Sequence, residues 1–525
     1  MVLAVACSTA GPVTPSPGGS VAPNFDASTT LTIRVNGDFA TFEPSEKIGN
    51  LPDSQIHPSL YDRLVFMGPD GKPQQYLASS WEVTPTSLKF NILKGITCSD
   101  GTALTPSAIA KHFDRVLGIS DPKTKTAFVA GEFGTGPFTV SADDAAGVFT
   151  LNLGTAFSEA VNGLAFGTDG EIVCPKGTAD PTILQNKPDG SGPYTLVSAD
   201  HTTGVTVKLR SDWKWGPNGR TSAGLPGTIV FKIIANDTTA ANSLITGELD
   251  IARILSGNDV TRLLANKQLG VSVKTPFYTN PMWLNINAGH PTSDKAVRQA
   301  LVTAVSSEDY NQATYGGYGT AVTSWFSKDA PCYEPKTADI LPKTSIADAK
   351  QVLIKAGYTT NSSGKFMGKD GKPLTVQVVG DTAQAPGVEY FLSQFNSLGL
   401  TVTPIVVDHV TYSAEYLAKG NWDVIVPGIA SDTLGSYALF YFGKNPTQGG
   451  RNYSYMTDET FQNEVQQALS SSGDAACNLW KKVQTDWISN YYGRPLSAAN
   501  FYFFYKNPKW TFASTEANLF PATLK

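Results

Sequence analysis

Acidic side chains follow predicted strands at three places in the C-terminal half of the chain. Asp381 comes directly after one strand, Asp408 after the next and Asp432 after the third. Two carboxylates held on either side of a glycosidic bond can hydrolyse it, one as acid and one as base or nucleophile. Asp381 and Asp408 also each precede a predicted helix, where an aspartate caps the free N–H groups of the first turn. For these two residues we favour capping over catalysis.

Other catalytic signatures are missing from the sequence. It contains no G-x-S-x-G nucleophile elbow, no H-E-x-x-H metalloprotease motif and no G-x-x-x-x-G-K-[ST] phosphate loop. We therefore expect a protein that is not an enzyme and that carries no cofactor. A secreted hydrolase is the competing class.

One β-α-β-α-β segment positions the residues at the strand ends. Strands are predicted at 374–380, 400–407 and 422–429, and the intervening helices near 387–398 and 411–419 each stop at a glycine. Strands that alternate with helices form a parallel sheet with right-handed crossovers. Ligands of such sheets lie off the carboxyl ends of the strands. The side chains at those ends are Asp381, Asp408, His409, Ser431 and Asp432.

The composition indicates a large folded protein with no affinity for polyanions. The 525 residues suggest about three domains at roughly 100–200 residues each. Forty Lys and Arg against 45 Asp and Glu leave a net charge of −5, which argues against a nucleic-acid binder or a polybasic membrane binder. No apolar run reaches the length of a membrane-spanning helix, so an integral membrane protein is excluded.

The N-terminus resembles the end of a bacterial lipoprotein signal. Small and apolar residues directly precede Cys7, and a flexible stretch rich in Ser, Thr, Pro and Gly follows to Thr30. We expect Cys7 to be lipidated and residues 1–30 to form a signal remnant and tether. The segment departs from the pattern, because it lacks a basic n-region and its apolar run is short. The alternative is a disordered terminus with an incidental cysteine.

Four further cysteines remain: Cys98, Cys174, Cys332 and Cys477. An even number in an exported chain predicts two disulfides, and four cysteines allow three pairings. A zinc site is the rival, but the sequence has no C-x2-C spacing and its five histidines are scattered. We therefore expect no metal.

A series of short motifs supplies the strongest indication of fold and function. In chain order they are Leu60–Leu64, Asp70–Pro73, Leu77–Val83, Leu93–Gly95, Ser99–Thr105, Ser191–Tyr194, Ile245–Asp250, Trp283–Asn287, Val297–Leu301, Ala356–Tyr358, Asp370–Leu374, Asn421–Asp423 and Asn452–Tyr455. This order resembles the family 5 solute-binding proteins of ABC importers, which include dipeptide- and oligopeptide-binding proteins. Each motif is weak alone, and the resemblance covers nearly all of residues 31–525.

The resemblance implies an α/β fold of the type II periplasmic-binding-protein kind, with two lobes that close on a ligand. Lobe I would combine residues 31–55, 190–275 and 486–525, and lobe II would span 276–485. An extra domain at 56–189 would decorate lobe I. Hinge strands near 275–285 and 485–490 would connect the lobes. With these boundaries, the pairings Cys98–Cys174 and Cys332–Cys477 each fall within one domain, and we favour them.

The resemblance also assigns Asp432 as the carboxylate that meets the α-ammonium group of a bound peptide, because a buried charge needs a partner. Ser431 lies beside it. The alternative is that Asp432 caps the turn that begins at Thr433. Dipeptide binders also place a basic side chain over the ligand carboxylate, near the start of the helix after the first strand of the β-α-β-α-β segment, but residues 381–386 contain no Lys or Arg. This departure favours a longer peptide or a ligand without a carboxylate there.

Aromatic residues near the expected pocket could contact the ligand. Trp325 follows a glycine-rich run, Trp283 and Asn285 lie near the hinge, and Tyr437 follows Asp432. Aromatic faces stack on sugars and also line peptide side-chain pockets. An oligosaccharide is therefore the second candidate ligand. The competing interpretation is that these rings belong to the core, and we favour it for Phe440.

These observations predict an extracytoplasmic, lipid-anchored solute receptor. We expect it to be a monomer that captures a short peptide between two lobes and delivers it to the permease subunits of an ABC transporter. Ligand would stabilise the closed arrangement of an existing equilibrium. An adhesion or scaffolding protein on the same fold is a further alternative.

Overall fold

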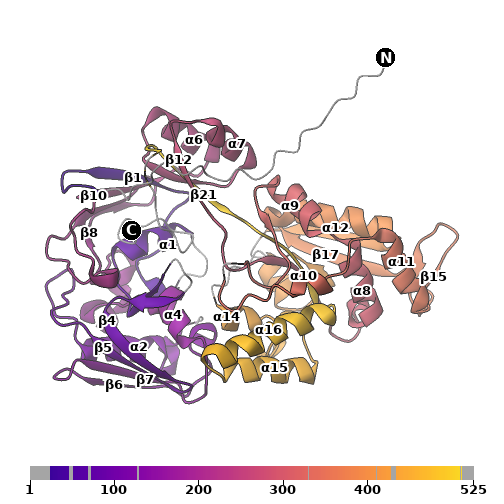
Figure 1. The fold of residues 1–525 in the computed structure, drawn as a ribbon, viewed down its shortest axis with the longest axis horizontal. Helices are drawn as coiled ribbons and strands as arrows, with labels where there is room; N and C mark the ends of the chain where they lie inside the picture. The colour runs from indigo at the N-terminus through magenta and orange to yellow at the C-terminus, as the bar shows by residue number, and fades with distance from the viewer. Residues whose placement is uncertain are drawn as a thin grey trace.

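Three large β-sheets organise the protein (Figure 1). The computed structural model describes residues 24–46, 51–68, 72–126, 129–328, 330–408, 411–426, 433–508 and 510. A seven-stranded and a six-stranded sheet both combine parallel and antiparallel strands with covering helices, and a four-stranded sheet is antiparallel. The predicted α/β class is confirmed.

The seven-stranded sheet gathers segments from distant parts of the chain. In sheet order its strands are β12 (Gly270–Lys274), β21 (Phe501–Tyr505), β11 (Ile251–Ile254), β1 (Thr30–Val35), β10 (Thr228–Ile233), β9 (Gly204–Leu209) and β8 (Tyr194–Asp200). β1 runs parallel to both of its neighbours, β10 and β11. Helices α6 (Asp237–Thr246) and α7 (Gly257–Ala265) pack their apolar residues against β11 in a separate small core.

The four-stranded sheet belongs to the segment expected as an extra domain. Its strands, in sheet order, are β4 (Ala78–Thr84), β5 (Ser87–Ile92), β7 (Val148–Asn152) and β6 (Thr139–Asp143). Helix α2 (Pro106–Val116) buries Ile109, Phe113 and Val116 in this region. The predicted disulfide between Cys98 and Cys174 is present, with a Cα–Cα distance of 6.1 Å.

The six-stranded sheet contains the predicted β-α-β-α-β segment. Its strands, in sheet order, are β14 (Thr320–Ala321), β20 (Gly493–Ala498), β13 (Asn280–Leu284), β19 (Val424–Ile425), β17 (Thr375–Asp381) and β18 (Thr401–Val407). β17 is parallel to both β18 and β19, as predicted. Helix α12 (Ala385–Leu398) joins β17 to β18, and the π-helical turn η9 (Tyr412–Leu417) stands where the second helix was expected.

The second connection between the two α/β sheets differs from the predicted one. Residues 486–525 were assigned to lobe I with a hinge near 485–490, but helix α16 (Gly473–Ser489) runs through that point. β20 then pairs with β13 and β14 inside the six-stranded sheet. The chain therefore changes sheets at residues 499–500, because both edges of β20 are satisfied in the second sheet. The first change, between β12 and β13, falls close to the predicted place.

The predicted pairing of Cys332 with Cys477 is also present, with a Cα–Cα distance of 4.9 Å. It attaches the loop after β14 to helix α16. The backbone carbonyl of Cys332 also accepts a hydrogen bond from the side chain of Gln484, at 3.0 Å. Both disulfides therefore link segments that the fold already brings together.

The extra domain contacts the lobe that contains the six-stranded sheet. The backbone N–H of Ser158 donates to the carbonyl of Leu469 at 2.7 Å, and the Ser436 hydroxyl donates to the carbonyl of Gly131 at 2.9 Å. One buried apolar cluster includes Leu31 of β1, Phe90 of the extra domain and Trp325. The six-stranded sheet has a separate core under α12.

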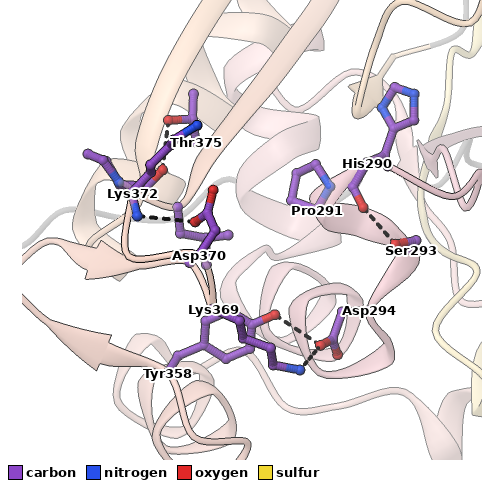
Figure 2. A pocket seen from close by; sticks show the side chains of 13 residues that line it. His290, Pro291, Ser293, Asp294, Tyr358, Lys369, Asp370, Lys372 and Thr375 are labelled. Atoms are coloured by element: carbon purple, nitrogen blue, oxygen red, sulfur yellow. Dashed lines mark hydrogen bonds and ion pairs between the residues drawn. The ribbon is translucent and has the colours of Figure 1, made fainter.

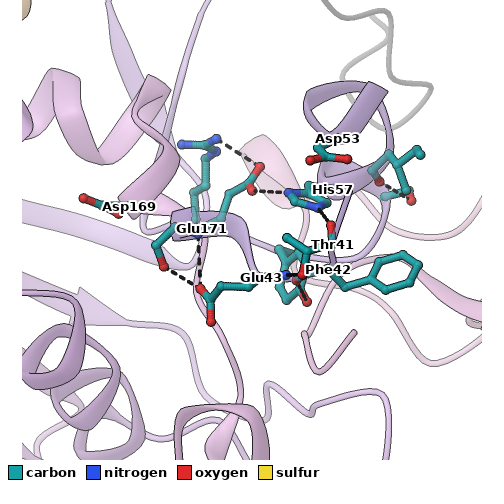
Figure 3. A network of polar contacts seen from close by, with 12 residues as sticks. Thr41, Phe42, Glu43, Asp53, His57, Asp169 and Glu171 are labelled. Carbon is teal, nitrogen blue, oxygen red and sulfur yellow. Dashed lines mark hydrogen bonds and ion pairs between the residues drawn. The ribbon is translucent and has the colours of Figure 1, made fainter. Parts of the chain in front are cut away.

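A buried charged network fastens the extra domain to the segment after β1 (Figure 3). Glu171 pairs with Arg63 at 3.1 Å and lies 3.5 Å from Nδ1 of His57. Burial alone would lower the pKa of His57, but Glu171 and the Thr41 carbonyl outweigh it and raise that pKa. Burial raises the pKa of nearby Asp169 to about 7. Asp169 at this junction therefore titrates near neutral pH.

Candidate ligand-binding site

Asp381 and Asp408, at the carboxyl ends of β17 and β18, both cap the turns that follow. The Asp381 carboxylate accepts hydrogen bonds from the backbone N–H groups of Ala383, at 2.9 Å, and Gln384, at 3.1 Å. Asp408 accepts from the backbone N–H and the hydroxyl of Thr411, at 3.0 and 2.6 Å. These are the contacts expected from the capping interpretation that we favoured over catalysis.

The end of the third parallel strand carries the most specific prediction. β19 ends at Ile425, and Ser431 and Asp432 lie outside the described residues, as do His409 and Cys7. The chain is described again from Thr433, whose hydroxyl caps helix α14 (Leu434–Ala438) by accepting from the N–H of Ser436. The assignments of Ser431 and Asp432 therefore remain predictions.

The structure brings three of the predicted aromatic residues together. Trp325 lies 5.4 Å from Tyr437 between ring centroids, and both contact Tyr441, which also lies 5.6 Å from Trp283. Trp325 is 0% exposed, and Trp283 and Tyr437 are each 1% exposed. Phe440 is also fully buried, as favoured, 4.9 Å from Trp283. The rings cover one another, so none offers a free face for a sugar.

Polar atoms within this aromatic cluster lack good hydrogen bonds. The indole N–H groups of Trp283 and Trp325 and the hydroxyls of Tyr437 and Tyr441 have no partner among the described residues. The Tyr437 hydroxyl is near Thr279, Trp283 and Tyr441, but at geometries too poor to count as hydrogen bonds. Burial raises the pKa of both tyrosines, so their hydroxyls are neutral.

Asn285 has a structural set of contacts. Its side-chain amide donates to the backbone carbonyls of Gly420, at 3.0 Å, and Trp422, at 2.9 Å, and its oxygen accepts from the N–H of Asn287. The residue is 0% exposed. The expectation that it contacts ligand stays a prediction, and the structure shows what else the side chain does.

A separate hollow of about 650 Å³ lies at the N-terminal end of β17, opposite the carboxyl ends of the parallel strands in the six-stranded sheet (Figure 2). Some of its polar side chains are already paired. Lys369 pairs with Asp294 at 2.6 Å and lies over the ring of Tyr358, while His290 contacts Asp423 at 2.7 Å. Its position away from the strand carboxyl ends argues against this hollow as the principal ligand site.

Two arginines near the carboxyl ends of parallel strands in the seven-stranded sheet are not among the residues predicted from the sequence. Arg34 is the fifth residue of β1 and Arg253 the third residue of the neighbouring parallel strand β11. Arg34 is 1% exposed and forms an ion pair with Asp237 at 2.7 Å. A signal was available, because each arginine is the one charged residue of its strand. Both α/β sheets thus present polar or aromatic side chains near the ends where ligands of such sheets bind.

Solved structures share this two-lobed α/β architecture. NikA from Brucella suis, in complex with Fe(III)-EDTA, superposes with a TM-score of 0.76 at 19% sequence identity, covering 95% of this chain and 99% of that one. The fold is therefore that of the type II periplasmic binding proteins. None of the helices in the described part of the chain is long and apolar enough to cross a membrane.

Sequence comparisons define the family. The model for bacterial extracellular solute-binding proteins, family 5 middle, matches residues 72–451, and the chain belongs to this family. The dipeptide-binding protein of Escherichia coli K12 is 24% identical over 453 residues, which cover 81% of each chain. The nickel-binding periplasmic protein of the same organism is 26% identical over 334 residues, and that match spans only 60% of its length.

Proposed function

We propose that this protein is the extracytoplasmic solute-binding component of an ABC importer and that it captures a short peptide between its two lobes. The observation that carries the proposal is the pair of α/β sheets joined through residues 275–279 and 499–500. Two crossings of this kind form a hinge about which lobes can close on a solute. The match to a dipeptide-binding protein over 81% of both chains supports peptide as the solute.

Native mass spectrometry of freshly purified protein tests this function directly. We expect a peptide to co-purify with the protein and to be released with its mass unchanged. We also expect small-angle scattering to show a smaller radius of gyration when peptide is added to the ligand-free protein. A peptide cleaved during incubation would support the competing hydrolase. Peptide capture would be rejected if no peptide co-purifies and if added peptide neither binds nor makes the protein more compact.

Asp432 is proposed as the partner of the peptide α-ammonium group. We expect Asp432→Ala to weaken a tripeptide with a free amine at least tenfold, which is about 1.4 kcal/mol, because the buried ammonium loses its counter-charge. An N-acetylated tripeptide should bind both proteins equally. Asp474→Ala, at the exposed start of α16, is the control. Calorimetry showing equal affinity of Asp432→Ala and wild type for the free amine would reject the assignment.

Attachment to the outer face of the membrane through Cys7 is a further part of this proposal. Metabolic labelling with an alkyne fatty acid in a bacterial host should label the wild type and leave Cys7→Ser unlabelled. Equal labelling of the two would reject Cys7 as the anchor. We also propose that the protein acts as a monomer on its permease subunits, which light scattering of the purified chain tests.

A further inference from the structure

Two arginines on neighbouring parallel strands have opposite surroundings. Arg34 donates to the backbone carbonyls of Ile234, Ala235 and Arg253 at 2.6–2.8 Å, in addition to its ion pair with Asp237. Asp237 in turn accepts from the N–H groups that follow β11. Each of the three guanidinium nitrogens of Arg34 therefore has at least one partner within the protein.

Arg253 has no such set of partners. No hydrogen bond or ion pair joins its guanidinium to any residue that the structure describes, and its Nε is fully buried. Its guanidinium carbon lies 3.9 Å from the centroid of the Phe501 ring. Burial lowers the pKa of Arg253 to about 10, which still leaves it a cation at neutral pH. The Asp237 carboxylate lies near enough to raise this pKa, but its described ion pair is with Arg34 and not with Arg253. The Arg253 guanidinium can therefore still pair with a further anion.

The two arginines line a small cavity at the strand ends with Asn36, Gln55 and Leu255. Asn36 follows β1, and Gln55 lies on helix α1 (Leu51–Ile56) with only 8% of its surface exposed. Both side chains end in a primary amide, which can donate and accept hydrogen bonds. The cavity has room for about one water molecule, so it can admit one oxygen atom of a ligand's terminal group but not a whole solute.

The cavity lies close to both connections between the lobes. Phe501, under Arg253, is the first residue of β21 after the second connection. Tyr278, in the first connection, is close enough to Arg253 for the two to interact electrostatically. A group bound to Arg253 would therefore sit at the base of the hinge, where lobe closure excludes water and strengthens a charge-assisted hydrogen bond.

We propose that Arg253, assisted by the amides of Asn36 and Gln55, binds a carboxylate of the transported solute. A guanidinium donates two parallel hydrogen bonds to a planar carboxylate, and primary amides supply further donors of the same kind. This proposal rests on the solute-binding function proposed above. It adds that lobe I recognises negative charge, whereas the proposed Asp432 contact recognises positive charge.

Native mass spectrometry with three probes tests the carboxylate site. The probes are a mixed tripeptide library lacking Asp and Glu with free C-termini, the same library as C-terminal amides, and succinate. We expect the wild type to retain the free acids at least tenfold better than the amides. Arg253→Gln should lose this preference, because glutamine removes the charge. Arg253→Lys should keep part of it, since lysine keeps the charge but not the paired donors.

Controls separate the site from folding and from the proposed function. Arg262→Gln is the matched control, because Arg262 lies on nearby α7 with its side chain 41% exposed and paired to Asp259. It should behave as wild type. Circular dichroism checks that Arg253→Gln is folded. If it is not, the preference of Arg253→Lys for free acids over amides is compared with that of the wild type instead.

Each result decides between the two proposals. If the wild type binds acids and amides equally, or Arg253→Gln keeps the wild-type preference, the carboxylate site is overturned and peptide binding stands. If succinate alone binds, and Arg253→Gln abolishes it, peptide capture fails and the carboxylate site stands. If none of the three probes binds the wild type, both proposals fail.

Discussion

The strand ends of the two α/β sheets carry contrasting chemistry. In the seven-stranded sheet they carry cations and amides, with Arg34 and Arg253 on adjacent strands. Near those of the six-stranded sheet, rings dominate, and Trp283, Trp325 and Tyr437 are buried in one cluster. A solute held between such surfaces would be fixed by charge on one side and by apolar contact on the other.

The contrast extends to how each side is stabilised. Buried charges are costly unless they are paired and hydrogen-bonded, whereas packed rings are stabilised by buried area and by ring–ring contacts. Arg34 meets the first condition and Arg253 does not. The charged side therefore has a residue whose role the fold does not explain. In the aromatic cluster the unmatched groups are neutral N–H and O–H donors, which cost less to bury.

The largest effect is expected on the aromatic side. Trp325→Ala should destabilise the protein by about 3–5 kcal/mol, because it removes a fully buried ring that contacts Tyr437, Tyr441 and Trp487. Urea unfolding followed by circular dichroism measures the change. Trp81→Ala, at a partly exposed ring of the extra domain, should cost clearly less. Equal losses would show that the cluster is not the tightly packed region described.

The two arginines should differ in stability as they differ in contacts. Arg34→Gln should cost about 3 kcal/mol or more, because it leaves the Asp237 carboxylate without its ion pair. Arg253→Gln should change the free energy of unfolding by less than about 1 kcal/mol, since no described ion pair or hydrogen bond is lost. Urea unfolding of each variant beside the wild type measures both changes in the free energy of unfolding. A large loss at Arg253 would indicate a structural role and weaken the case for a ligand site.

Stability should depend on pH through the charged junction and not through the aromatic cluster. The pKa of Asp169 is raised to about 7 from 3.8, so the folded state keeps a proton that the unfolded state releases. Stability is therefore greatest below pH 4 for this group and falls as the pH rises toward 7. The raised pKa of His57 acts in the same direction above pH 6.5. Between pH 5 and 7 the Asp169 contribution is on the order of 2 kcal/mol.

Asp169→Asn isolates this contribution. Its unfolding temperature should fall less between pH 5 and 8 than that of the wild type, because asparagine cannot ionise. Tyr441→Phe should leave the pH profile unchanged, since burial keeps that hydroxyl neutral throughout. Differential scanning calorimetry at four pH values distinguishes these outcomes, and parallel profiles for wild type and Asp169→Asn would contradict the assignment.

The smallest effect tests the unmatched hydroxyls. Tyr437→Phe should change stability by less than about 1 kcal/mol in either direction, because the hydroxyl it removes has no good hydrogen bond within the described residues. Thermal unfolding measures this. A loss of several kcal/mol would show that the Tyr437 hydroxyl has a hydrogen-bond partner. The aromatic cluster would then resemble the surroundings of Arg34, where the polar groups are hydrogen-bonded.

Local patterns predicted much of the second lobe. The apolar runs and glycine stops of 374–429 predicted the parallel order of β17, β18 and β19, because strand and helix periodicity are local properties. The capping of Asp381 and Asp408 followed from the same pattern. The boundary at 486 failed, because the sheet that β20 joins depends on β13 and β14, which are more than 170 residues away.

By itself the sequence determined the α/β class, the motif order of the family and four cysteines able to form two bridges. Only the tertiary structure decided between the two arginines. Each arginine is near the end of a strand that has no other charged residue, so the local sequence does not distinguish the two. Asp237 and three carbonyls converge on Arg34 from other segments, while the guanidinium of Arg253 lies over the ring of Phe501. The difference lies in long-range packing, which places partners that residue spacing cannot reveal.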